Sequence, residues 1–142
     1  MNELKRFNYL VSELDNCFHE IAVQQGLTDS ASKILYTLLD SNGSCPLSQI
    51  LRSTGIPKQT ANSALRKLEA EGTLCLQKDS GRKKSVCLTE SGSLLAERTV
   101  GQVQRMENEI LESWSKAERQ LYLDLTQRYL NQLKEKSKEL RT

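Results

Sequence analysis

A predicted helix that opens after Pro57 carries a set of side chains suited to hydrogen bonding. Its apolar residues recur at helical spacing, as expected for a buried face: Ala61, Ala64, Leu65 and Leu68. Other positions present short polar groups and one arginine: Gln59, Thr60, Asn62, Ser63 and Arg66. A solvated helix surface tends toward Glu/Lys pairs, whereas amide, hydroxyl and guanidinium groups are those that read base edges in a DNA major groove.

The chemistry of these side chains divides them into two groups. Arg66 could pair bidentately with guanine, and Gln59 or Asn62 with adenine, each pair giving roughly 1–3 kcal/mol of discrimination. Lys58, Thr60 and Ser63 suit phosphate as well as bases, and phosphate contacts position a protein without specifying a sequence. An ordinary exposed helix face is the alternative interpretation of the whole set.

A basic hairpin follows this helix. Gly72 ends the helix, and two strand-like runs, TLCLQK and SVCL, flank the turn DSGRKK. The turn contains Arg82, Lys83 and Lys84, and Arg82 is placed to enter a minor groove. A solvated charged turn is the alternative. Helix, hairpin and basic tip together predict a winged helix-turn-helix.

Charge is concentrated in this middle part of the chain. From Arg52 to Lys84, eight basic and three acidic residues give a local charge of +5, against +2 for the whole chain. A positive middle between acidic ends is typical of a protein that binds a polyanion.

The preceding elements would position the polar helix. A first helix, ending near Gly26, has a heptad-like apolar stripe: Leu4, Phe7, Val11, Leu14, Phe18 and Ile21. Thr28 or Asp29 caps a second helix, which a turn over 42–44 ends. A short third helix from Pro46 closes at Gly55, so a short glycine-containing turn joins it to the polar helix, as in a helix-turn-helix.

Two further helices are expected after the hairpin. Thr89 caps a single long helix whose apolar side is Leu94, Leu95, Val103, Met106, Ile110 and Trp114. A capping box over 115–118 starts a last helix with Leu121, Leu125, Tyr129 and Leu133 on its apolar side. A compact winged domain has little surface to bury the apolar faces of these terminal helices, so we expect a homodimer.

The order of these elements, with GIPKQTANSALRKLEAEGTL and GRKKSVCLTESG, resembles the MarR family of bacterial transcription regulators. The resemblance implies a mainly α fold with a small β-hairpin wing, dimerisation helices over 1–26 and 91–142, and a DNA-binding region over 28–90. Members resemble one another in being dimeric, usually repressors of pseudo-palindromic operators, and often release DNA on meeting small aromatic molecules or oxidants. One departure is Ser80, which stands where the family's wing usually has aspartate.

Other chemistry is not indicated. The 142 residues, 37% hydrophobic and 27% charged, suit one soluble domain, with no membrane span or signal peptide, so we expect a cytoplasmic protein. No phosphate loop or nucleophile motif predicts an enzyme or a cofactor. His19 is the one histidine and no C-x-x-C pair occurs, which disfavours a metal site. The residues of an effector pocket are not indicated.

Two cysteines leave an alternative open. Cys75 and Cys87 lie on the two predicted wing strands, nearly opposite one another if the hairpin turns near Gly81. A disulfide between them would make a redox switch, while small apolar fillers are the alternative. The sequence thus predicts a ligand-responsive, DNA-binding repressor. The alternatives are a thiol-based redox sensor and a winged-helix module that binds protein and no nucleic acid.

Overall fold

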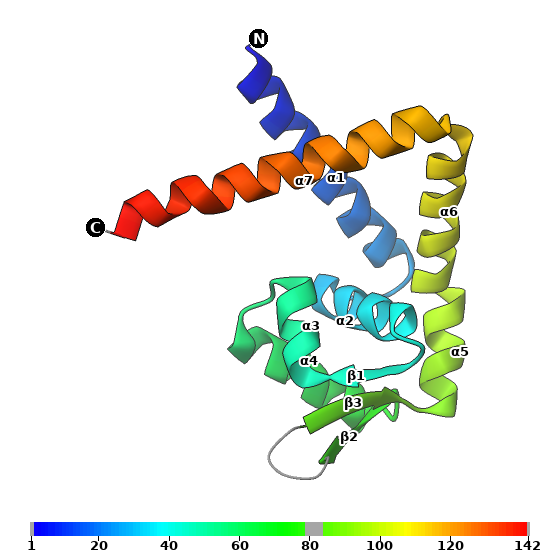
Figure 1. The fold of residues 1–142 in the computed structure, drawn as a ribbon. Coiled ribbons are helices and arrows are strands. Elements are labelled where there is room, and N and C mark those ends of the chain that lie inside the picture. The colour runs from blue at the N-terminus through cyan, green and yellow to red at the C-terminus, as the bar shows by residue number, and fades with distance from the viewer. Residues whose placement is uncertain (1, 79–83, 142) are drawn as a thin grey trace. The chain divides into compact units, whose positions relative to one another are not determined.

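The protein is described here by a computed structural model covering residues 2–78 and 84–141 (Figure 1). Its elements in chain order are α1 (Glu3–Gln24), α2 (Asp29–Asp40), β1 (Ser44–Pro46), α3 (Leu47–Thr54), α4 (Lys58–Ala70), β2 (Leu74–Lys78), β3 (Lys84–Leu88), α5 (Glu90–Arg98), α6 (Val100–Ser113), α7 (Lys116–Ser137) and the 3₁₀ turn η1 (Lys138–Arg141). This mainly helical, winged-helix architecture confirms the predicted fold class. The chain divides into two compact units, Met1–Gln102 and Val103–Thr142.

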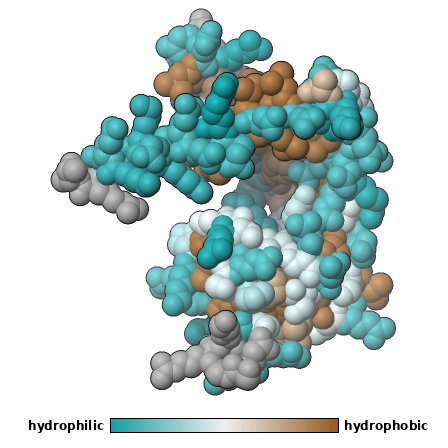
Figure 2. All heavy atoms as spheres, viewed as in Figure 1, coloured by the Kyte–Doolittle hydropathy of each residue, from teal (hydrophilic) through white to brown (hydrophobic). Residues whose placement is uncertain are grey.

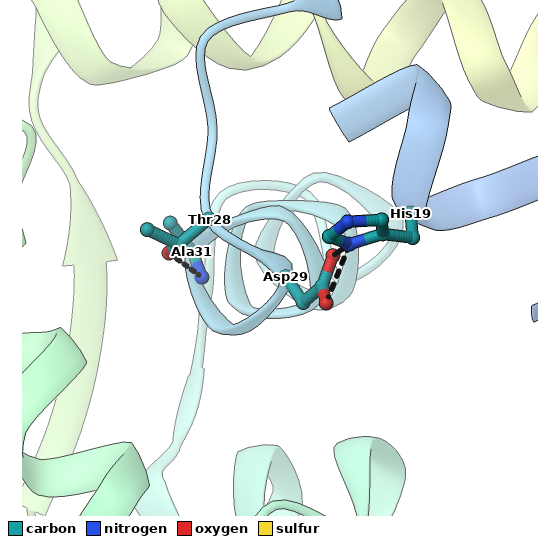
Figure 3. A network of polar contacts seen from close by, with 4 residues as sticks. All are labelled: His19, Thr28, Asp29 and Ala31. Carbon is teal, nitrogen blue, oxygen red and sulfur yellow. Dashed lines mark hydrogen bonds and ion pairs between the residues drawn. The ribbon is translucent and has the colours of Figure 1, made fainter. Parts of the chain in front are cut away.

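Polar side chains fix the junction between α1 and α2 (Figure 3). The Thr28 hydroxyl accepts a hydrogen bond from the Ala31 amide at 3.1 Å, so Thr28 rather than Asp29 is the cap of α2. Asp29 instead lies 2.9 Å from Nδ1 of His19, near the end of α1. Both side chains of this pair are exposed, so it adds little stability but links the two helices.

A third strand completes the wing's sheet, and the sequence did not predict it. The strand order is β1-β3-β2, all antiparallel, with Cys45 of β1 opposite Val86 of β3 and Val86 opposite Leu76 of β2. The expected two-stranded hairpin is therefore extended by β1, which includes a proline. Pro46 is tolerated because β1 is an edge strand.

The core of the first unit lies between the sheet and the three helices α2, α3 and α4, as Figure 1 shows. Ile34, Leu38 and Ile50 are fully buried there, as is Val86 from the central strand. Burying a side chain of this size contributes about 1.5–3 kcal/mol. The helices and the wing therefore form one packed body.

The long helix predicted after Thr89 is interrupted. Thr99 leaves helical geometry, with φ −113° and ψ −89°, and separates α5 from α6. Its hydroxyl donates to the Leu95 carbonyl at 2.7 Å, and the side-chain amide of Gln25 donates to the Thr99 carbonyl at 2.9 Å. The expectation of one helix was wrong, and the contact at the break, made across 74 residues, is not visible in a local pattern. Leu94, expected on the apolar side, is exposed.

The second unit turns a sharp corner between α6 and α7. Ser115 and Glu118 form the predicted capping box, with Ser115 accepting from the Glu118 amide at 3.1 Å and Glu118 from the Ser115 amide at 2.8 Å. The Arg119 guanidinium donates to the Trp114 carbonyl at 2.6 Å, and the Trp114 ring packs edge-on against Tyr122 at 5.4 Å. These contacts fix the start of α7.

Candidate nucleic-acid interface

The turn before α4 is short and tightly bonded. Gly55 takes a left-handed conformation with φ +67°, which a glycine adopts without strain. The Thr54 hydroxyl donates to the Ile50 carbonyl at 2.7 Å and accepts from the Ile56 amide at 3.3 Å. Ile56 is itself buried in the core. The three residues between α3 and α4 thus hold the helices at a fixed angle, as a helix-turn-helix requires.

Helix α4 has two chemically different faces, as the sequence predicted. Ala61, Leu65 and Leu68 are buried against the core. The other face, here called the reading face, consists of Lys58, Gln59, Thr60, Asn62, Ser63 and Arg66. All of its members are exposed except Asn62, which is half-buried. Apolar packing therefore leaves the hydrogen-bonding side chains directed away from the protein.

Ser63 and Asn62 are less available to DNA than the other members of the reading face. The Ser63 hydroxyl donates to the Gln59 carbonyl at 3.1 Å, one turn back along the helix, so a base or phosphate would have to share or replace that bond. Asn62 is half-buried, so a base can reach its side chain from fewer directions. Arg66 is exposed and is the longest side chain of this face that can pair bidentately with a base.

The wing follows directly from the end of α4. Gly72 adopts φ +77°, and the Thr73 amide donates to the Leu68 carbonyl at 2.9 Å, which turns the chain into β2. At the far end of the hairpin, Lys78 of β2 lies opposite Lys84 of β3, and both are exposed. Arg82 and Lys83, also predicted to contact DNA, lie outside the described residues.

Lys78 is a candidate that sequence reasoning left out of the site. Lys78 contributes to the positive charge of residues 52–84, but only the strand register shows that it lies opposite Lys84 across the hairpin. Like charges directly opposite one another destabilise a strand pair. A polyanion bound at this end of the wing would relieve that repulsion, so the register itself was the missing signal.

The base of the wing is fastened to α5. The Thr89 hydroxyl donates to the Gly72 carbonyl at 2.6 Å and accepts from the Gly92 amide at 3.0 Å, which caps the helix. The Thr89 amide donates to the Thr73 carbonyl at 3.1 Å. The end of α4, the wing and the start of α5 therefore meet at one residue.

The cysteines are placed as the hairpin predicted. Cys75 lies directly opposite Cys87 in the register, both are half-buried, and both are free thiols. Burial raises the pKa of the Cys75 thiol, and the neighbouring Cys87 and Glu69 act in the same direction. Cys75 therefore stays protonated at neutral pH.

Within the part of the chain that the structure describes, no group of three or more metal-ligating side chains comes together. None of the helices in residues 2–78 and 84–141 has the length and apolar character needed to span a bilayer.

Comparison with known families and structures gives a consistent result. Residues 25–84 match the model of the MarR family. The structure is similar to NMB1585, a MarR family regulator from Neisseria meningitidis, with a TM-score of 0.80 and 24% identity over 100% of both chains. A comparison with curated proteins found no match.

Two further solved structures are similar. One is the Staphylococcus aureus MepR–DNA complex, with a TM-score of 0.71 and 19% identity over 94% of this chain and 98% of that one. The other is Bordetella bronchiseptica BpsR, whose DNA binding is regulated by 6-hydroxynicotinic acid. Its TM-score is 0.65, with 24% identity over 87% of this chain and 98% of that one. At these identities the similarity establishes the fold.

Proposed function

We propose, from the premise that this chain is a MarR-type winged-helix protein, that it is a sequence-specific DNA-binding transcription regulator acting as a homodimer. The family match over 25–84 covers α2 to the wing, the part that would contact DNA. As a regulator of transcription it would act in the cytoplasm.

One observation carries the proposal: the reading face is exposed, while the opposite face of the same helix is buried. A helix mounted this way fits the major groove, which accepts one helix and displays hydrogen-bonding patterns distinct for each base pair. Arg66 would pair with guanine and Gln59 or Asn62 with adenine. Lys58, Thr60 and Ser63 would contact phosphate or bases.

The wing would supply the second set of contacts. Lys78 and Lys84 would bind phosphates, since these two exposed lysines are directly opposite in the strand register at the end of the hairpin. Arg82 and Lys83 would extend this contact into the adjacent minor groove. Because the contacts are ionic, binding should weaken steeply as salt rises.

The helices at both ends of the chain support a dimer. Figure 2 shows hydrophobic side chains at the surface around α1 and α7. They include Leu10 and Leu14 of α1, which are 48% and 53% exposed, and Leu121 of α7, which is 59% exposed. A second copy covering these faces would bury them and place two reading faces about one helical turn of DNA apart, on a pseudo-palindromic operator.

The sign of regulation and its control are proposed by analogy. BpsR is a protein whose DNA binding is regulated by 6-hydroxynicotinic acid. By analogy, this protein would be a repressor that leaves its operator when a small aromatic effector favours a dimer with a different spacing of its reading faces.

The test is selection of genomic DNA. The purified full-length protein is mixed with fragments of the source genome, and retained fragments are sequenced, with an Arg66→Ala, Gln59→Ala double variant as the matched control. We expect enrichment of an imperfect palindrome by the wild type and loss of that enrichment in the variant. Retention of fragments without a shared sequence would contradict specific recognition, and no retention at low salt would favour a protein-binding module.

A further inference from the structure

One serine and two cysteines lie in a row across the outer face of the wing's sheet. Ser44 of β1 is opposite Cys87 of β3, and Cys87 is opposite Cys75 of β2, so the three share one face. The Ser44 hydroxyl lies 3.2 Å from the Cys87 sulfur. Two thiols are thus neighbours across adjacent strands.

The hydrogen-bond pattern defines the type of site that these thiols occupy. The Thr89 amide donates to the Thr73 carbonyl, and hydrogen-bonded pairs alternate along an antiparallel ladder. Two residues further along each strand, Cys75 and Cys87 therefore form a hydrogen-bonded pair. Such a pair has Cα atoms about 5.5 Å apart, within the range of a disulfide.

The Cβ atoms at such a site are less well matched. Directly opposite residues have Cβ atoms about 5 Å apart, whereas a disulfide requires about 3.8 Å. Closing the bond would draw the two strands together on their outer face by about an ångström. The bond can form in the folded protein, but it would strain the hairpin and be readily reduced.

We propose that Cys75 and Cys87 form a reversible disulfide that weakens DNA binding, which makes the wing the site of redox control. This inference rests on the proposed function. The oxidant is a low-molecular-weight disulfide such as oxidised glutathione. Cys87, as its thiolate, attacks it and releases one glutathione, and Cys75 then gives up its proton and displaces the other. The two cysteines lose two electrons and two protons, and two reduced glutathione molecules are formed.

The strain would reach both DNA-contacting parts. Cys75 is three residues from Lys78, so a change in the twist of the strands alters where the wing's lysines point. On the other face of the sheet, Leu74 and Val86 belong to the same buried cluster as Leu65 of α4. A shift of β2 against β3 is therefore transmitted to the helix that carries the reading face.

The experiment uses the full-length protein with Cys17→Ser, which removes the exposed thiol of α1 and leaves the pair intact. Oxidised glutathione is added, free thiols are alkylated, and peptide mapping by mass spectrometry locates any disulfide. Affinity for a selected operator is then measured by fluorescence anisotropy before and after treatment, and again after dithiothreitol. Matched variants carry Cys75→Ser or Cys87→Ser in the same background.

We expect a Cys75–Cys87 disulfide, a fall in operator affinity of about tenfold or more through lost phosphate contacts, and recovery on reduction. Neither Cys→Ser variant should respond. The proposal is overturned if the two cysteines are alkylated after treatment, if the disulfide forms and affinity is unchanged, or if the variants respond like their parent. Failure of the reduced protein to bind DNA would instead refute the proposed function, and peptide mapping would still report whether the disulfide forms.

Discussion

Gly92 packs so closely on Thr73 that a Cβ atom added at position 92 would lie 1.8 Å from the Thr73 carbonyl oxygen. This contact seats the first turn of α5 against the turn between α4 and β2, where Thr89 also bonds to Thr73. No side chain fits there without moving the backbone of one element.

We therefore predict that Gly92→Ala lowers the free energy of unfolding by about 3 kcal/mol, because the added methyl group overpacks a rigid site. Ser93→Ala, at the exposed next position, is the control and should change it by less than about 0.5 kcal/mol. Urea denaturation followed by circular dichroism measures both. Equal stability of the two variants would show that α5 is not held as described.

Arg66→Ala should reduce specificity more than affinity. Losing a bidentate contact to guanine removes about 1–3 kcal/mol of discrimination, so operator binding weakens while binding to random DNA changes little. Anisotropy titrations on both duplexes measure the ratio, with Arg98→Ala, an exposed arginine of α5, as the control. Equal losses of affinity for the two duplexes would show that Arg66 contacts phosphate and not a base.

Lys84→Ala and Lys78→Ala should weaken binding to all sequences alike. Each removes one cation from the far end of the wing, so the slope of log affinity against log salt should become shallower by about one per variant. Because the two lysines repel one another in the free protein, either variant should also unfold at a slightly higher urea concentration. An unchanged salt slope in both variants would show that neither Lys78 nor Lys84 contacts DNA.

Leu121→Glu combined with Leu125→Glu should produce monomers that no longer bind the operator. These exposed leucines lie one turn apart on α7, and two carboxylates there would be desolvated in a dimer interface. Lys134→Glu, on the opposite side of the same helix, is the control. Analytical ultracentrifugation reports the assembly, and a dimeric double variant would place the interface elsewhere.

The start of α7 should be sensitive to acid. Hydrogen bonds from the Ser115 amide and hydroxyl lower the pKa of the Glu118 carboxyl. A lowered pKa in the folded state means that the ionised group stabilises the helix above its unfolded pKa, and this contribution is lost as pH falls through the folded value. NMR titration should show Glu118 losing its charge at a lower pH in the wild type than in Ser115→Ala, which removes the hydroxyl but keeps the backbone amide.

Much of the fold was predictable because its signals are local. Thr28, Ser115 and Gly55 each mark a helix end through a bond or a backbone conformation within a few residues. The two faces of α4 follow from spacing alone, and the opposition of Cys75 and Cys87 follows from the length of the hairpin.

The features that were missed depend on distant contacts. β1 has three residues and a proline, and it is a strand only because β3 pairs with it some 40 residues later in the chain. The break at Thr99 is accompanied by a hydrogen bond from the distant Gln25 side chain. That Lys78 lies opposite Lys84 is known only from the strand register. Tertiary structure decided these points, and each bears on how the site is positioned.

Hydroxyl-radical footprinting on one genomic fragment selected by the protein shows whether two reading faces contact the DNA together. We predict two protected segments, centred about one helical turn apart and related by a two-fold axis, that vanish with the Arg66→Ala, Gln59→Ala double variant. A single protected segment, or two that persist in that variant, would contradict the assignment of the reading face and of the dimer that presents it.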